Sequence, residues 1–301
     1  MSTLKIGAIQ KATILSQALP YIQKYNGKIV VVKYGGNAMK NETLKQNVMT
    51  DIVLLSEVGI HVVLVHGGGP EINKMLDKVG KKSTFISGLR YTDEETMDVV
   101  QMVLAGKTNK DLVSLINQKG ARAVGLSGID AGIIQAKQYR LPEGDDLGYV
   151  GEISDINEQL ILDVIEKGYI PVIASVGCDE TGHTFNINAD TAASSIASKL
   201  HAENMILVSD IPGVLADPKD EQSLLPRIYL DEIEGLKDSG VISGGMIPKV
   251  ECCRSAVQDS VKRAVIIDGR VPHSILIEMF SEEGIGTMFE DKDCEGKECQ
   301  M

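Results

Sequence analysis

The sequence predicts an α/β fold of three layers, α/β/α, in which helices cover both faces of an open, mostly parallel sheet with two lobes. First, strand and helix patterns alternate almost throughout the 301 residues, which is typical of parallel strands joined by helices. Second, the strand patterns are runs of Val and Ile with little polar alternation, as expected for strands buried on both faces. Third, glycine clusters stand beside strand ends or helix starts, where ligands can approach the backbone.

The expected elements follow from these patterns. Strands are predicted at Lys28–Val32, His61–Val65, Ala121–Leu126, Ile133–Ala136, Tyr169–Ser175, Met205–Val208 and Arg263–Ile267. Helices are predicted at Asn41–Val58, Glu71–Val79, Asp93–Ala105, Asn109–Gln118, Ile156–Lys167, Ala189–Leu200 and Pro248–Gln258. The acidic triplet that follows Thr92 is interpreted as a favourable first turn of a helix, not as a catalytic cluster. The segment Arg140–Gly148 is rich in charge, Pro and Gly, and is expected to be an exposed hairpin or loop.

The chain is expected to have four parts, at residues 1–26, 27–200, 201–289 and 290–301. The first part precedes the first strand and has an apolar stripe at helical spacing, formed by Ile14, Leu15, Ala18, Leu19 and Ile22. Pro20 lies inside this pattern and is expected to kink the helix near Ser16. This helix is expected to pack on its own subunit or on a neighbour. The last part is polar and is predicted to be a disordered tail.

The composition excludes several classes of protein. The formal net charge of -12 makes general nucleic-acid binding improbable, and no apolar run reaches the length needed to cross a bilayer. The first residues lack the apolar region of a secretion signal. The five cysteines are odd in number and irregularly spaced, which favours a reduced, cytoplasmic chain. Zinc binding by Cys294 and Cys299 is disfavoured because no further Cys or His lies near them, so no protein metal site is predicted.

Three glycine clusters indicate an anion site. They are Lys33-Tyr34-Gly35-Gly36-Asn37, His66-Gly67-Gly68-Gly69-Pro70 and Ser243-Gly244-Gly245-Met246-Ile247-Pro248-Lys249. Backbone amides at such places hold anions, and two of the clusters carry a lysine, so we expect a site built around phosphates. Gly106-Lys107-Thr108 is not interpreted as a P-loop, since Gln101 stands where that motif needs glycine and no strand precedes it. The dinucleotide fingerprint also fails on its spacing.

Five motifs stand in register along the chain, namely Lys33-x-Gly35-Gly36, His66-Gly67-Gly68-Gly69-Pro70, Gly88-Leu89-Arg90-Tyr91-Thr92, Asn186-Ile187-Asn188-Ala189-Asp190 and Gly244-Gly245-Met246-Ile247-Pro248-Lys249. In this order they resemble the amino acid kinase family and, within it, the kinases of N-acetylglutamate. The resemblance runs from about Lys28 to Met288. The departures are mild, namely Tyr91 in place of a small aliphatic residue and Ser209-Asp210 in place of Thr-Asp. The resemblance implies an acceptor-binding and dimerisation lobe at 27–200 and a nucleotide-binding lobe at 201–289.

The resemblance implies a phosphotransferase with a carboxyl acceptor. It would use ATP and Mg²⁺ to phosphorylate the γ-carboxylate of N-acetyl-L-glutamate, giving an acyl phosphate and ADP, a step of arginine biosynthesis. A carboxylate is already ionised at neutral pH and needs no general base, but its repulsion from the polyphosphate must be screened. Lys33 and Lys249 are expected to supply that charge and Asp190 to orient both lysines. The amides of Gly35 and Gly36 are expected to hold the transferring phosphate.

The binding residues follow from the same motifs. Arg90 is expected to clamp the unreactive carboxylate of the acceptor bidentately. The acceptor pocket is completed by Gly68, Gly69, Asn186 and, less directly, Asn188. The nucleotide is expected near Ser209, Asp210, Gly245 and Met246. His66 is interpreted as a hydrogen-bonded histidine at a strand end, without a catalytic role.

Two alternatives stay open. One is another amino acid kinase, acting on aspartate, glutamate or a carbamate. A free amino acid would need an acidic partner for its ammonium group, and the segments Gly88–Thr92 and Asn186–Asn188 offer none. The other is a non-catalytic, ligand-sensing relative, which the joint presence of Lys33, Asp190 and Lys249 disfavours.

The N-terminal helix implies regulation. With its kinked N-terminal helix, the chain resembles the arginine-inhibited homohexamers of the family, which are trimers of dimers whose N-terminal helices interlace. The resemblance implies allosteric inhibition by L-arginine. Tyr21, Glu278 and Gly284 are the expected contacts of the inhibitor. The alternative is a helix that only caps its own subunit, and a signalling protein as a further partner stays open.

Overall fold

The structure is a computed structural model that describes residues 7–39, 41–141, 144 and 146–292. The α-helices are α1 Ala8–Tyr25, α2 Glu42–Glu57, α3 Gly69–Lys78, α4 Glu94–Gln101, α5 Asn109–Gln118, α6 Gln159–Glu166, α7 Ala189–Lys199, α8 Ile233–Asp238, α9 Met246–Asp259 and α10 Ser274–Phe280. The strands are β1 Ile29–Tyr34, β2 His61–His66, β3 Phe85–Ile86, β4 Leu89–Arg90, β5 Ala123–Ser127, β6 Ile134–Arg140, β7 Asp146–Ile156, β8 Ile170–Ala174, β9 Val176–Cys178, β10 Thr184–Asn186, β11 Asn204–Ser209, β12 Arg227–Tyr229, β13 Arg263–Asp268 and β14 Thr287–Glu290.

The main sheet has eight strands in the order β12-β14-β13-β11-β1-β2-β8-β5. From β13 to β5 all neighbours are parallel, whereas β14 pairs antiparallel with β13. In the centre Lys33 of β1 lies opposite Val65 of β2 and Leu207 of β11. The loops that follow β1, β2 and β11 therefore all start at the carboxyl ends of the strands, which is where ligands bind in open α/β sheets.

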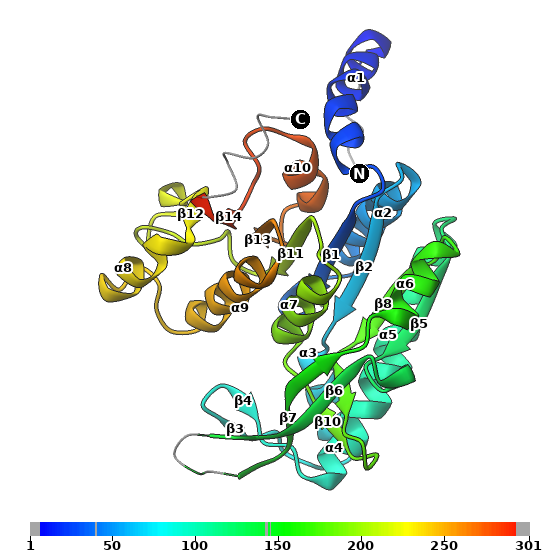
Figure 1. Cartoon of the computed structure of the whole chain (residues 1–301), viewed down its shortest axis with the longest axis vertical. Coiled ribbons are helices and arrows are strands. Elements are labelled where there is room, and N and C mark those ends of the chain that lie inside the picture. Colours follow the sequence, from blue (N-terminus) through cyan, green and yellow to red (C-terminus); the bar gives the residue numbers. More distant parts are fainter. Residues whose placement is uncertain (1–6, 40, 142–143, 145, 293–301) are drawn as a thin grey trace.

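Helices cover both faces of this sheet, as the sequence predicted (Figure 1). On one face, apolar residues of α6, α7 and α9 pack against inward residues such as Val31 and Val63. On the other face, α2, α5 and α10 pack against Val30, Val32 and Val62. Successive strand residues point to opposite faces, so a run of valines without polar alternation is the pattern that both helical layers require.

A second, smaller sheet was predicted only in part. Strands β6, β7, β9 and β10 close on one another in a barrel-like arrangement. Arg140 pairs with Asp146, so the expected hairpin is present. However, β7 continues to Ile156, where the sequence predicted the start of a helix, and α6 begins only at Gln159. The residues of β7 are a mixture of Gly, charged and apolar types because much of this strand is only partly buried, so no apolar run announces it.

The helices expected at Asp93–Ala105 and Asn109–Gln118 are parts of one continuous helical stretch. A π-helical segment, Met102–Thr108, joins α4 to α5 without a loop. Gly106, Lys107 and Thr108 are thus helical, in agreement with the rejection of a P-loop. Leu104 of this segment is buried against α3, which places the π-helix directly beside the loop after β2.

Helix α1 projects from the rest of the chain, with only its last residue, Tyr25, buried (Figure 1). It continues through Pro20, whose ring nitrogen cannot donate the helical hydrogen bond to Ser16. Three residues of the apolar stripe are exposed in the single chain, with exposed fractions of 53% for Ile14, 72% for Leu15 and 52% for Leu19. Among the described helices, none is both long and apolar enough to cross a membrane.

The predicted C-terminal tail, residues 290–301, starts at a residue that the structure places in a strand. Glu290 is the last residue of β14, is buried, and pairs with Arg227 and Arg263. An acidic residue in a polar run does not indicate a strand, and the two arginines, which come from β12 and β13, make its burial favourable. Residues 293–301 of the predicted tail lie outside the described residues.

Candidate active site

Two lysines from different elements meet one buried carboxylate. Lys33 ends the apolar run of β1, Asp190 lies in the first turn of α7, and Lys249 lies in the first turn of α9. Lys33 Nζ is 2.8 Å from Asp190 Oδ1, and Lys249 Nζ is 2.7 Å from Asp190 Oδ2. The structure therefore brings together the three residues that the sequence predicted as the catalytic group.

The charge of Asp190 is fixed by these lysines. Burial by itself raises the pKa of a carboxyl group, but the charges and hydrogen bonds of Lys33 and Lys249 outweigh it and lower the pKa of Asp190 to about 2. Both lysine side chains are also largely buried, with exposed fractions of 10% and 22%. Two ammonium groups are thus held by the two oxygens of one carboxylate, which leaves a net positive charge to attract anions.

The glycines beside Lys33 and after β2 make room for a ligand. Gly36 has φ +67°, a conformation that favours glycine, and a Cβ on Gly35 would lie 3.4 Å from Lys33 Nζ. Gly68 is the N-cap of α3, and a Cβ there would lie 2.7 Å from Leu104 Cδ2. A side chain at Gly68 would clash with Leu104, so the close packing at the start of α3 requires a glycine there.

Arg90 is buried at the wall of the same cleft. One of its terminal nitrogens, Nη1, donates to Ser83 Oγ, and the other, Nη2, donates to the carbonyl oxygen of Gly69 at 3.3 Å. Its guanidinium lies 4.7 Å from the centre of the Phe85 ring. Burial lowers the pKa of Arg90 from its usual value, yet an arginine stays charged in any protein environment. Because both contacts are to neutral groups, the charge of Arg90 is available to an anionic ligand.

Asn186 and Asn188 have different surroundings. Asn186 ends β10 and donates to Thr92 Oγ1 at 3.2 Å, while Thr92 Oγ1 donates to the carbonyl of Arg90. Asn188 is the N-cap of α7, and its Oδ1 accepts from the amides of Asp190 and Thr191. The cap holds the first turn of α7 in place and thereby positions Asp190.

Most of these residues line one cleft at the carboxyl ends of the strands, whereas Lys249 reaches Asp190 from outside this lining. Its lining is Lys33, Gly35, Gly36, Gly67, Gly68, Gly69, Ile72, Phe85, Gly88, Leu89, Arg90, Leu104, Val150, Ser175, Asn186, Ile187, Asn188, Ala189 and Asp190. All predicted acceptor residues are in this set. Among the described residues of the lining, Asp190 is the one carboxylate.

Of the predicted nucleotide residues, Gly35 and Gly36 line the cleft, whereas Ser209, Asp210, Gly245 and Met246 lie outside its lining. Ser209 ends β11, next to β1, and Asp210 follows it. Gly245 is the N-cap of α9 and Met246 its first residue, three positions before Lys249. Both groups are at the edge of the sheet at which Lys33 lies, but the structure does not bring them into contact with Arg90 or Asn186.

The sequence reasoning missed several residues that shape the cleft. Ser83 and Phe85 hold Arg90, Thr92 holds Asn186, and Leu104 contributes an apolar wall. Ser83 and Phe85 stand near a loop and carry no spacing signal. Leu104 was predicted to be helical, but its place against Gly68 depends on the π-helix, which no sequence period marks.

His66 is a structural residue, as its sequence context indicated. It is fully buried, its Nδ1 lies 3.0 Å from the Gly67 carbonyl oxygen, and its Nε2 lies 3.1 Å from Asn109 Nδ2. Burial lowers the pKa of His66 to about 4, so the imidazole is neutral at physiological pH. Among the described residues, no group of three or more His, Cys, Asp or Glu side chains could hold a metal ion.

A second cavity lies between α1 and the C-terminal part of the chain. It is lined by Tyr21, Lys24, Tyr25, Pro226, Arg227, Arg263, Glu278, Met279, Ser281, Glu282, Glu283, Gly284, Gly286 and Met288. Glu278 Oε2 accepts from the amide of Ile285 at 2.9 Å, and burial raises the pKa of Glu278. Gly284 has φ +62°, and a Cβ on it would lie 2.8 Å from Glu278 Oε2. The three predicted regulatory residues therefore share one cavity.

The model of the amino acid kinase family matches residues 28–268. The chain belongs to the amino acid kinase family. Within the family, it is 55% identical over 280 residues to a protein named acetylglutamate kinase from Clostridioides difficile, covering 93% of this chain and 97% of the relative. A relative of the same name from Desulfitobacterium hafniense is 55% identical over 289 residues, again covering 93% and 97%.

The amino acid kinase fold is also seen in solved structures. The N-acetylglutamate synthase of Neisseria gonorrhoeae, in complex with coenzyme A and N-acetyl-glutamate, superposes with a TM-score of 0.81 at 24% identity. The superposition covers 93% of this chain, and this chain spans 63% of the synthase. At this identity the likeness establishes the shared fold alone.

Proposed function

We propose that this protein phosphorylates the γ-carboxylate of N-acetyl-L-glutamate with ATP, giving N-acetyl-L-glutamyl 5-phosphate and ADP, and so takes part in arginine biosynthesis. The proposal rests on one observation: the group formed by Lys33, Asp190 and Lys249 lies beside two glycine clusters and a buried arginine. The family membership and relatives named acetylglutamate kinase at 55% identity support it.

The lysines would act on the transferring phosphoryl group. In the loose transition state of phosphoryl transfer, negative charge on the phosphoryl oxygens and the leaving oxygen is stabilised by fixed cations. Lys33 and Lys249 would supply this charge, and the amides of Gly35 and Gly36 would hold the phosphoryl oxygens. Because Asp190 holds both ammonium groups before the ligands arrive, little reorganisation is needed during the reaction.

The cleft fits an N-acylated dicarboxylic acid. Arg90 would bind the unreactive carboxylate, with Asn186 and the amides of Gly68 and Gly69 beside it. A free amino acid would bring an ammonium group, and the one carboxylate in the described lining, Asp190, is already paired with two lysines. An uncharged acyl amide avoids this cost.

The nucleotide would lie across Ser209, Asp210, Gly245 and Met246, next to the acceptor cleft. Mg²⁺ would be held chiefly by the phosphates of ATP, since the described residues contain no three-ligand cluster and Asp190 is engaged by the lysines. We accordingly propose residues 27–200 as the acceptor lobe and 201–289 as the nucleotide lobe.

We further propose inhibition by L-arginine and assembly into a hexamer. The cavity beside Tyr21 has a carboxylate, Glu278, for a guanidinium group. The exposed stripe of α1, with Ile14 and Leu19 about half exposed at 53% and 52%, would be covered by a neighbouring subunit.

The decisive experiment is ADP release in the presence of N-acetylglutamate, glutamate, aspartate or no acceptor. We expect release with N-acetylglutamate and little above background with the others. Equal release with glutamate or aspartate would favour a different amino acid kinase, and no acceptor-dependent release would favour a ligand-sensing relative.

A further inference from the structure

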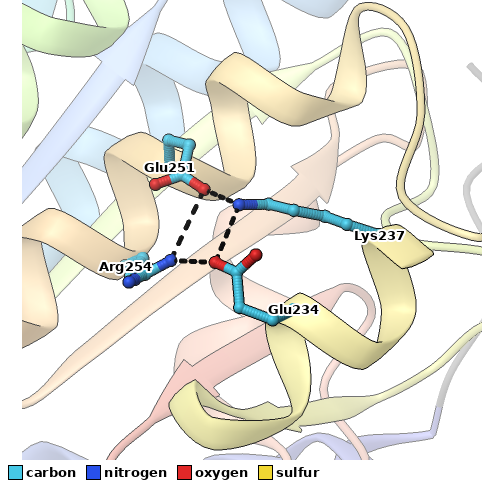
Figure 2. Close-up of polar contacts among 4 residues, drawn as sticks. All are labelled: Glu234, Lys237, Glu251 and Arg254. Atoms are coloured by element: carbon cyan, nitrogen blue, oxygen red, sulfur yellow. Dashed lines mark hydrogen bonds and ion pairs between the residues drawn. The ribbon is translucent and has the colours of Figure 1, made fainter.

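Four charged side chains form a closed ring between α8 and α9 (Figure 2), and none of them lines the acceptor cleft. Glu234 and Lys237 come from α8, and Glu251 and Arg254 come from α9. Lys237 pairs with Glu251 and, at 3.1 Å, with Glu234. Arg254 pairs with Glu234 and lies 3.8 Å from Glu251. Each acid thus contacts both cations, and we name these four residues the α8–α9 ionic ring.

The ring is more constrained than a usual surface ion pair. The exposed fractions of the side chains are 20% for Lys237, 30% for Arg254, 42% for Glu251 and 63% for Glu234, so the two cations are partly withdrawn from solvent while the two acids are exposed. In a closed ring, a side chain ordered by one partner is already ordered for the next, which reduces the entropy lost per contact. The hydrogen bonds to Glu251 and Glu234 raise the pKa of Lys237, in keeping with mutual stabilisation of the charges.

Helix α9 has independent anchors on its other side. Ser194 of α7 donates to the carbonyl of Cys252 at 3.0 Å, and Ser260 donates to the carbonyl of Ser198 at 2.7 Å. Val250, Cys253 and Ala256 are buried in the core. Lys249 therefore keeps its place beside Asp190 without the ring.

The segment that connects α8 to α9 is tied mainly to α8: the amide of Gly240 donates to the carbonyl of Lys237 at 2.9 Å, and the amide of Ile242 donates to the carbonyl of Leu236 at 3.0 Å. Of residues 239–245, only Ile242 is buried, while Ser239, Gly240, Ser243, Gly244 and Gly245 are exposed. Gly240 and Gly244 have positive φ values of +79° and +54°. The end of this segment, with Gly245 and Met246, is the proposed nucleotide contact. Its start follows α8, which Ile233 anchors in the core and the ionic ring holds against α9.

We propose that the α8–α9 ionic ring positions the connecting segment 239–245 for the nucleotide, as a set of positioning residues that touch no substrate. This rests on the proposed function, in which ATP lies against Gly245 and Met246. Loss of the ring leaves Lys249 and the acceptor cleft in place but lets the segment sample other positions. The expected signature is weaker nucleotide binding with little change in the acceptor or in the chemical step.

The test compares two variants at one position. Lys237→Gln removes the cation that contacts both acids, and Lys237→Arg keeps the charge. The matched control is Asp231→Asn, which removes an exposed ion pair with Lys292 in the same part of the chain. Glu251→Gln is a second ring variant, should Lys237→Gln not fold.

We expect Lys237→Gln and Glu251→Gln to raise KM for ATP about three- to tenfold. Their KM for N-acetylglutamate and their kcat should stay within about twofold, and Lys237→Arg and Asp231→Asn should resemble the parent protein. Calorimetric titration with a non-hydrolysable ATP analogue should show the same loss of affinity, and amide exchange should accelerate in 239–245 and not in β13.

Unchanged affinity for the analogue, or an equal loss in Asp231→Asn, would overturn the proposal. So would an effect on kcat or on the acceptor KM alone. Because analogue binding and amide exchange do not need turnover, these outcomes are separate from failure of the proposed kinase activity, which would appear as no acceptor-dependent ADP release by the parent protein.

Discussion

Replacement of Lys249 by Ala is the sharpest test of the catalytic group. The substitution removes one of the two ammonium groups beside Asp190, 2.7 Å from its Oδ2, and leaves Lys33 at 2.8 Å from Oδ1. Loss of one fixed charge that stabilises a transition state typically costs about 3–4 kcal/mol, which corresponds to about 10²–10³-fold in rate. We therefore expect kcat to fall by that factor at saturating ATP and N-acetylglutamate.

The fold should survive this substitution. Asp190 keeps one cationic partner, so the destabilisation should be below the roughly 3–5 kcal/mol seen when a buried charge loses its only partner. The assay is coupled ADP release, with urea unfolding in parallel. Lys262→Ala is the matched control, because Lys262 pairs with Glu203 in the same lobe and its side chain is half exposed at 51%.

The reasoning fails if Lys249→Ala keeps a kcat within about tenfold of the parent protein while remaining folded. It also fails if Lys262→Ala loses as much activity, because the effect would then follow from removal of any lysine. A large rise in KM at unchanged kcat would place Lys249 in ground-state binding instead of transition-state stabilisation.

Four further predictions concern other parts of the structure. Arg90→Lys should raise KM for the acceptor and leave KM for ATP unchanged, because the bidentate fork is lost; a selective effect on ATP contradicts the lobe assignment. Gly68→Ala should impair acceptor binding, since its Cβ would lie 2.7 Å from Leu104; a normal acceptor KM argues against a tight cleft there. The free energy of unfolding should fall by up to about 3 kcal/mol between pH 6.5 and pH 4, because His66, with a folded pKa of about 4, binds its proton only on unfolding; the fall should shrink in His66→Gln. Deletion of residues 1–24 should leave an active, smaller assembly with little arginine sensitivity, whereas an unchanged mass and dose response in solution refute both roles of α1.

Much of the main sheet could be predicted because its signals are local. The valine run that ends in Lys33 and the run that ends in His66 identify buried parallel strands, and the glycines after them indicate ligand loops. The same holds for α2, α7 and α9, whose apolar spacing lies within a few turns. The parts that failed lack such a signal: β7 is mixed in composition, and α8 and α10 have only 6 and 7 residues.

The sequence by itself determined which residue types surround the cleft, since the lysines, Arg90 and the glycines stand in motifs that keep their order and spacing. Only the tertiary structure decided how they meet. Asp190 and Lys249 are 59 residues apart, and the 2.7 Å contact between them exists because α7 and α9 pack side by side on one face of the sheet. The same applies to Arg90 on Phe85, to Glu290 between two arginines, and to the α8–α9 ionic ring. A sequence period reports which face of an element is buried, whereas a contact between distant elements depends on the packing of the whole core.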